Sequence, residues 1–110
     1  VAVIVDMVGD ADLKLYYEGF SDRDTSAQIW RIAKALGYSD IFIPESKYTI
    51  IDDHYPFIEA GIPAVDIIDF EYPYWHTTED TVDKLSEKSL EAVGRTIQSW
   101  LLELAESWQK

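Results

Sequence analysis

The sequence predicts an α/β fold in which strands and helices alternate. Two apolar, β-branched runs, 1–5 and 62–70, are typical of strands buried inside a sheet. Two segments, 24–38 and 86–108, place their apolar residues on one face, as amphipathic helices do. Since these elements alternate along the chain, we expect a partial three-layer structure, a sheet with flanking helices.

Size and charge limit the classes of function. The chain has 110 residues, which suits one domain over 1–110 or a segment of a larger one. Its net charge of −12 makes nucleic acid and anionic membranes poor partners. It has no cysteine, which excludes disulfides and a thiol nucleophile and leaves the compartment undetermined. No apolar run is long enough to predict a membrane span.

The first half contains three further strand-like segments and one helix. Segment 11–20 alternates loosely and predicts a second strand, and 40–44 and 48–51 are short and apolar. In the helix at 24–38, Thr25 and Gln28 form a plausible capping box, and Gly37 lies where a helix-ending glycine belongs.

The second half predicts a short helix and a long one. Segment 54–61 has Pro56 in its first turn and Gly61 at its end. Ser86 can cap the long helix. The apolar stripe of that helix consists of Leu90, Val93, Ile97, Trp100, Leu101, Leu104 and Trp108.

Carboxylates and imidazoles follow the predicted strands. Asp6 ends the first strand, Asp52 follows 48–51, and His76 follows the last strand. Functional groups of α/β sheets gather beyond strand ends. A buried carboxylate needs a metal, a base or backbone donors, although Asp6 could instead cap a turn through Gly9. His76 is either a zinc ligand or a structural residue.

Asp52 and Asp53 are neighbours, so an extended backbone would point them to opposite sides. We assign Asp52 to the site and Asp53 to capping the helix that follows. Facing acids such as Asp6 and Asp52 could share a proton, which would raise one pKa into a range useful for proton transfer. Other acids are interpreted as non-functional: Asp66 and Asp69 at the sheet end or surface, and Glu18, Asp22 and Asp24 in a solvated loop.

Three motifs in this order resemble one enzyme family. They are "VDMVGD", "IDDHYPFIEAGIPAVDIIDF" and "YPYWHTTEDT". Together they resemble the C-terminal half of the M28-family zinc aminopeptidases and the related glutaminyl cyclases. The resemblance extends from Asp6 to the final helix and implies the C-terminal part of a zinc-exopeptidase fold.

The resemblance implies roles for particular residues. In the peptidases, residues matching Asp6 and His76 bind zinc, one or two ions in the complete enzyme. In the cyclases, residues matching Asp6 and Asp52 form an acidic relay, which makes both candidate catalytic groups. Trp75, the aromatic residue before the histidine, is expected to line the substrate pocket. We also expect Tyr72 and His54 on the substrate side, although His54 could merely begin the helix.

The resemblance leaves activity and partners open. Cyclases often carry glutamine where this chain has Ile51, whereas Trp75 favours the cyclases over many of the peptidases. In members of this family, an N-terminal half supplies four further residues: a histidine, a bridging aspartate, a catalytic glutamate and a ligand glutamate. Three hypotheses follow: zinc-dependent exopeptidase action on a peptide or N-terminal amino acid, glutaminyl cyclisation, or a non-catalytic self-assembling fragment. We expect the partner to be that N-terminal half or a second copy.

Overall fold

A computed structural model of the chain describes residues 1–70, 77–79 and 81–108. Along the chain these residues form β1 (Ala2–Asp6), β2 (Leu15–Glu18), α1 (Arg23–Ala35), β3 (Phe42–Tyr48), α2 (Tyr55–Glu59), β4 (Ala64–Ile68), a 3-10 turn (Val82–Lys84) and α3 (Glu87–Trp108). The predicted α/β class is confirmed. The helices and most strands lie within a few residues of their predicted bounds, but the separate strand predicted at 48–51 is wrong, because β3 spans Phe42–Tyr48 and residues 49–51 are not in a strand.

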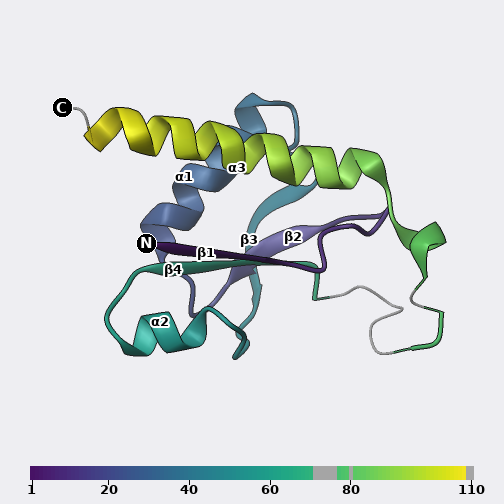
Figure 1. Cartoon of the computed structure of the whole chain (residues 1–110), viewed down its shortest axis with the longest axis horizontal. Helices are drawn as coiled ribbons and strands as arrows, with labels where there is room; N and C mark the ends of the chain where they lie inside the picture. The colour runs from purple at the N-terminus through teal and green to yellow at the C-terminus, as the bar shows by residue number, and fades with distance from the viewer. Residues whose placement is uncertain (71–76, 80, 109–110) are drawn as a thin grey trace.

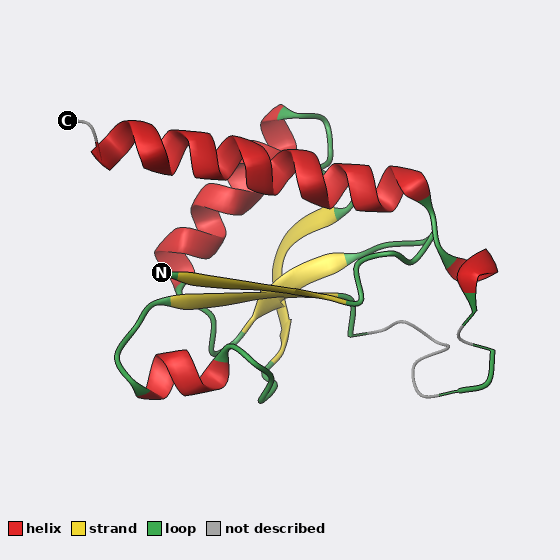
Figure 2. Ribbon diagram, in the orientation of Figure 1, coloured by secondary structure: helices red, strands yellow, loops and turns green. Residues whose placement is uncertain are grey.

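The strands form two parallel pairs that lie in one central layer (Figure 2). β1 pairs with β4, with Ile4 opposite Asp66. β2 pairs with β3. β3 and the segment after β2 bond to β4: the Tyr48 hydroxyl donates to the Ile68 carbonyl at 3.0 Å, and the Asp22 N–H donates to the Ala64 carbonyl at 2.7 Å.

Helices cover the two faces unequally. The long helices α1 and α3 lie on one side of the strands and the short α2 lies on the other (Figure 1). The main core fills the space under the long helices, since burial of apolar area is the dominant stabilising term. Its buried members are Leu13, Leu15, Ile29, Trp30, Ile32, Ala33, Phe42, Val65, Ile67, Val93 and Trp100.

The ends of the two long helices test the predicted caps. Ser86 caps α3 as predicted, because its hydroxyl accepts from the Lys88 N–H at 3.2 Å. Gly37 ends α1 with a φ of 92°, which glycine adopts without strain. The capping box from Thr25 is wrong. Asp22 is the cap, and it accepts from both the backbone N–H and the hydroxyl of Thr25.

The cap predicted for the short helix is also wrong. His54 occupies the N-cap position of α2 and makes no capping bond with its side chain, while Asp53 is exposed. The turn is closed by the backbone instead, because the Tyr55 N–H donates to the Asp52 carbonyl at 3.0 Å.

The apolar stripe of α3 divides into two parts. Val93 and Trp100 are buried in the core as predicted. Leu90 and Leu101 remain about half exposed, at 49% and 51%, and face a groove beside β1. Within the described residues, no helix combines the length and the apolar character needed to cross a bilayer.

Candidate functional site

The candidate site begins at the end of β1. Asp6 is its last residue and is half-buried. The next residue, Met7, has a φ of 51°, in the left-handed region that residues other than glycine rarely adopt. Such strained backbone clusters at functional sites, where the surrounding structure maintains it.

Asp52 brings two other acids together. It lies close enough to Asp6 and Asp66 to raise the pKa of both of their carboxyl groups. One of its oxygens, Oδ2, is buried and accepts from no donor among the described residues. Ionised carboxylates only accept hydrogen bonds, so two of these acids can bond to each other only when one of them is protonated. Asp6 and Asp52 lie near each other, and the sharing of a proton between them stays a prediction.

Electrostatics at the site favour protonated acids. Burial, followed by the negative charges of Asp52 and Asp53, raises the pKa of Asp6 above its ordinary value of 3.8. Burial, followed by contact with Asp52 and the charges of Asp52, Glu18 and Asp6, raises the pKa of Asp66 to about 8. The cluster can hold and release protons near neutral pH.

The interpretation of Asp66 as a sheet-end or surface acid is wrong. Asp66 is fully buried in the middle of β4, and Asp69 is only 2% exposed. β4 is covered on both faces, so a side chain at any position along it is removed from water. Both carboxyl oxygens of Asp66 lack a donor among the described residues.

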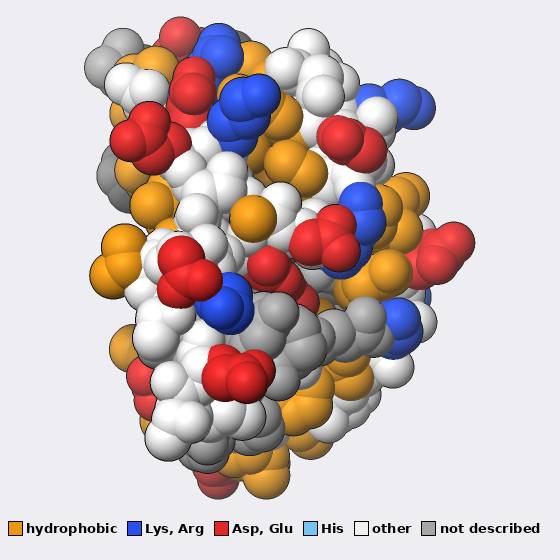
Figure 3. All heavy atoms as spheres, turned by 90° about the vertical axis from the view of Figure 1, so that its right-hand side faces the viewer, with side chains coloured by type: hydrophobic (Ala, Val, Ile, Leu, Met, Phe, Trp, Pro, Cys, Tyr) orange, Lys and Arg blue, Asp and Glu red, His pale blue; other side chains and the backbone are white. Residues whose placement is uncertain are grey.

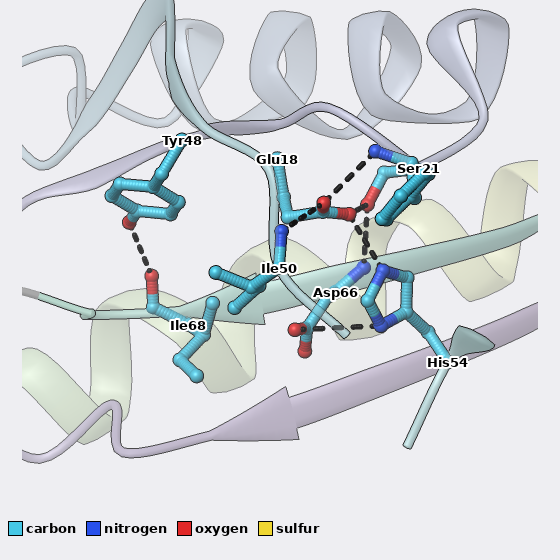
Figure 4. A network of polar contacts seen from close by, with 8 residues as sticks. Glu18, Ser21, Tyr48, Ile50, His54, Asp66 and Ile68 are labelled. Atoms are coloured by element: carbon cyan, nitrogen blue, oxygen red, sulfur yellow. Dashed lines mark hydrogen bonds and ion pairs between the residues drawn. The ribbon is translucent and has the colours of Figure 1, made fainter. Parts of the chain in front are cut away.

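Glu18 is the second acid that was placed wrongly. It is 3% exposed and therefore does not belong to a solvated loop. Its Oε1 contacts His54 Nε2 at 2.6 Å, and His54 Nδ1 lies 3.5 Å from Asp66 Oδ2 (Figure 4). Glu18, His54 and Asp66 thus lie in sequence, and Asp52 and Asp6 are close enough to affect the pKa of Asp66.

The sequence analysis did not assign Glu18 and Asp66 to the site, although the sequence around each of them contains a signal. Asp66 interrupts the apolar run "AVDII", and Glu18 ends "LYYE" directly before a glycine. Lone acids inside buried strands carry a large desolvation penalty and need partners. His54, which is also buried, is a partner of both.

Of the remaining predicted site residues, the structure describes only His54. His54 has no exposed surface, which argues against the direct contact with substrate expected for it. Tyr72, Trp75 and His76 lie outside the described residues.

Zinc does not fit the described residues alone. Of the two residues that the resemblance assigns to the metal, only Asp6 is described, and a zinc site uses about four ligands. Within 1–70, 77–79 and 81–108 there is no group of three or more His, Asp and Glu residues that could hold a metal ion.

The surface near the site is mixed in character. The carboxyl ends of β1 and β4 point to the right in Figure 1, and Figure 3 shows that end of the molecule. Acidic side chains there lie among basic and hydrophobic ones rather than in a single patch. The chemically distinctive acids are therefore the ones buried behind this surface.

Comparison with known proteins identifies a family. The model of "Peptidase family M28" matches residues 1–101. A glutaminyl-peptide cyclotransferase of Boiga irregularis is 33% identical over 58 residues, which is 52% of this chain and 16% of that protein. The chain therefore spans a small part of this curated relative's length.

Two solved structures have the same fold. Glutaminyl cyclase from Porphyromonas gingivalis aligns with a TM-score of 0.87 and 34% identity, covering 94% of this chain and 42% of that one. A Zn-dependent exopeptidase from Parabacteroides distasonis aligns with a TM-score of 0.81 and 29% identity, covering 86% and 36%. This chain thus matches well under half of each.

Proposed function

This chain belongs to peptidase family M28, and we propose that it is part of a zinc-dependent enzyme that acts on the N-terminal residue of a peptide. The similar structures support this proposal, since one is a cyclase and another a Zn-dependent exopeptidase. Zinc enters as the family's metal, with Asp6 and His76 as the proposed ligands from this chain. The remaining ligands would come from outside it.

Of the two reactions, glutaminyl cyclisation is favoured by one observation, the proximity of the carboxyl groups of Asp6 and Asp52. In this reaction the N-terminal amine attacks the γ-carboxamide carbon of glutamine, a C–N bond forms and ammonia leaves. The amine must lose a proton and the leaving nitrogen must gain one. Two carboxyl groups that share a proton can perform both transfers in sequence.

The exopeptidase reaction is the second candidate, and Ile51 favours it over the cyclase. The Zn-dependent exopeptidase from Parabacteroides distasonis also supports it. There the acids at the site would bind the ammonium group of the substrate's N-terminus, which a negative site attracts. Trp75 and Tyr72 are proposed to line the substrate pocket in either reaction.

Paired assays on this chain combined with a separately expressed N-terminal half and zinc test the proposal. One follows ammonia release from a peptide with N-terminal glutamine, and the other follows release of the first residue from an ordinary peptide. Ammonia release that is lost in Asp52→Asn supports cyclisation. Residue release that is lost in His76→Ala supports the exopeptidase. Zinc retained by the combined protein without either activity would contradict both reactions and favour the hypothesis of a non-catalytic fragment.

The proposed partner is the N-terminal half of the same type of enzyme. An apolar groove lies between β1 and α3, lined by Val5, Val8, Leu90, Val93, Gly94, Ile97, Gln98, Leu101 and Leu102. Exposed apolar patches of this kind mark contact surfaces. The aligned cyclase has more than half of its chain outside the match, which is enough to supply a cover. A second copy of this chain is the alternative occupant.

A further inference from the structure

Glu18 makes four polar contacts inside the fold. Its Oε2 accepts from the Phe20 N–H at 2.9 Å and from the Ile50 N–H at 3.0 Å. Its Oε1 accepts from the Ser21 hydroxyl at 2.9 Å and contacts His54 Nε2 at 2.6 Å (Figure 4). Every acceptor direction of this buried carboxylate is used, which is what burial of such a group requires.

The directions of these bonds assign the tautomer of His54. Ser21 Oγ accepts from the Asp66 N–H at 2.9 Å, so its own hydrogen is free to point to Glu18. The two backbone N–H groups can only donate. Glu18 is therefore an acceptor throughout, and Nε2 of His54 carries the hydrogen between them. The other ring nitrogen, Nδ1, then faces Asp66.

These bonds hold the segment that carries Asp52 at two points. Ile50 lies two residues before Asp52 and His54 lies two residues after it, and both are bound to the one carboxylate of Glu18. Through Ser21, the same carboxylate is also connected to the backbone of β4 at Asp66. The loop is thereby fixed against the strand that bears the acid facing Asp52.

Close packing at the turn after β2 supports this arrangement. A Cβ atom on Gly19, next to Glu18, would collide with the side chain of Thr49. Gly19 also donates its N–H to the Tyr48 carbonyl at 2.9 Å. The absence of a side chain therefore lets the backbone at Glu18 lie directly against the loop that leads to Asp52.

We propose that Glu18 and His54 are positioning residues, a buried clamp that holds Asp52 against Asp6 and Asp66. The inference rests on the proposed function for its catalytic meaning, but its structural content is independent of activity. The clamp acts through Asp52 and touches no substrate, because both side chains are buried. It also gives His54 a role other than the expected substrate contact.

A pair of variants of similar length isolates the clamp. His54→Gln keeps a side-chain N–H that can donate to Glu18, whereas His54→Met removes the donor. The control is Arg31→Met, which breaks only the exposed ion pair between Arg31 and Glu103 at 3.0 Å. Amide hydrogen exchange by NMR is measured on the folded chain for all three and for the wild type, at one pH and temperature.

We expect the hydrogen-bonded amides of Ile50 and Tyr55 to exchange about tenfold or more faster in His54→Met than in the wild type, since a loop-closing buried hydrogen bond of ordinary strength is lost. Amides of α1 and α3 should change only with global stability. His54→Gln should restore most of the protection. Equal acceleration of all amides, or no rescue by glutamine, would overturn the clamp.

If His54→Met does not fold, Ser21→Ala decides the question at a greater distance from Asp52. It removes the hydroxyl between Glu18 and Asp66, so the Ile50 and Asp66 amides should exchange faster than those of α1. Unchanged local exchange in this variant would overturn the proposal.

Turnover separates the clamp from the proposed function. Where the zinc-loaded protein turns over substrate, His54→Met should lower kcat with KM unchanged, and His54→Gln should recover part of kcat. A raised KM with normal kcat would overturn a positioning role. Absence of turnover in the wild type would count against the proposed function alone, since hydrogen exchange has already decided the clamp.

Discussion

The two sides of the β1–β4 pair differ in how completely they are covered. On one side, Glu18, His54 and Asp66 are buried and contact one another. On the other, an apolar groove between β1 and α3 is open, with Leu101 and Leu102 51% and 60% exposed. On one side of this pair polar side chains are buried, and on the other side some apolar side chains are exposed to solvent. This is the reverse of the usual distribution.

The difference shows where this chain is self-sufficient. The buried Glu18 is tolerated because the folded chain supplies hydrogen-bond partners for it, so the polar side depends on this chain's own residues. The exposed apolar area of the groove favours association with a partner. Substitutions on the polar side should therefore change stability, and substitutions in the groove should change assembly.

The largest effect is expected from Glu18→Ala. Removing this carboxylate leaves the buried His54 ring and the Ile50 N–H without their acceptor, which we expect to lower the free energy of unfolding by about 3 to 5 kcal/mol. Denaturant unfolding measures the change. Glu45→Ala, at an exposed position in β3, is the control and should change it by less than about 0.5 kcal/mol. Similar losses from both variants would remove the distinction between the two acids.

The next effect is a pH dependence set by Asp66. Its pKa is about 8 in the folded chain and 3.8 as the ordinary value, so between these pH values the folded state binds more protons than the unfolded state. The contribution of Asp66 to the free energy of unfolding is therefore fully present below about pH 4. It decreases as pH rises to about 8, by at most about 1.4 kcal/mol per pH unit.

Asp66→Asn should flatten this part of the profile, because asparagine does not titrate. Asp24→Asn, which changes an exposed acid, should leave the slope unchanged. Unfolding by urea at a series of pH values measures both. An unchanged slope in Asp66→Asn would show that Asp66 does not hold a proton in the folded chain.

The sequence predicted the elements better than it predicted the burial of individual acids. Hydrophobic patterns are local, so they revealed β1, β4 and α3 without tertiary information. The burial of Glu18 is not local, because its partners Ile50 and His54 lie more than thirty residues away. The sequence placed Asp6 near Asp52 because both follow predicted strands. The involvement of Asp66 required knowing that β4 is covered on both faces.

The failed caps have the same cause. Asp22 and Thr25 are both good cap residues, and the sequence does not reveal which one starts α1. The choice is made by β4, whose Ala64 carbonyl accepts from the Asp22 N–H and so fixes where the helix begins. Local propensity thus predicts the helix, whereas contact with a distant strand determines its first residue.

A smaller effect is expected at Asp22, which lies between the two extremes of burial. Hydrogen bonds from the Thr25 hydroxyl and N–H hold the pKa of Asp22 below 3.8, so its contribution is present above that pH and is lost as pH falls through the lowered value. Asp22→Ala should cost about 1 kcal/mol at neutral pH. Asp22→Asn, which keeps a capping oxygen, should cost less. Equal costs for the two would argue against the cap.

The smallest effect on stability, and the largest on assembly, is expected in the groove. Leu102 is 60% exposed on α3, and lysine is nearly as good a helix former as leucine, so Leu102→Lys should change the free energy of unfolding by less than about 0.5 kcal/mol. If the groove joins copies of this chain, sedimentation should show a lower average mass for Leu102→Lys than for the wild type. The control Glu106→Gln makes the same change of net charge at an exposed position outside the lining of the groove, and it should leave the mass unchanged.

A wild type that sediments as a monomer would exclude a second copy as the stable occupant and favour the N-terminal half of the enzyme. In that case Leu102→Lys should weaken binding of the separately expressed half, and an unaffected affinity would show that the groove is not the contact surface.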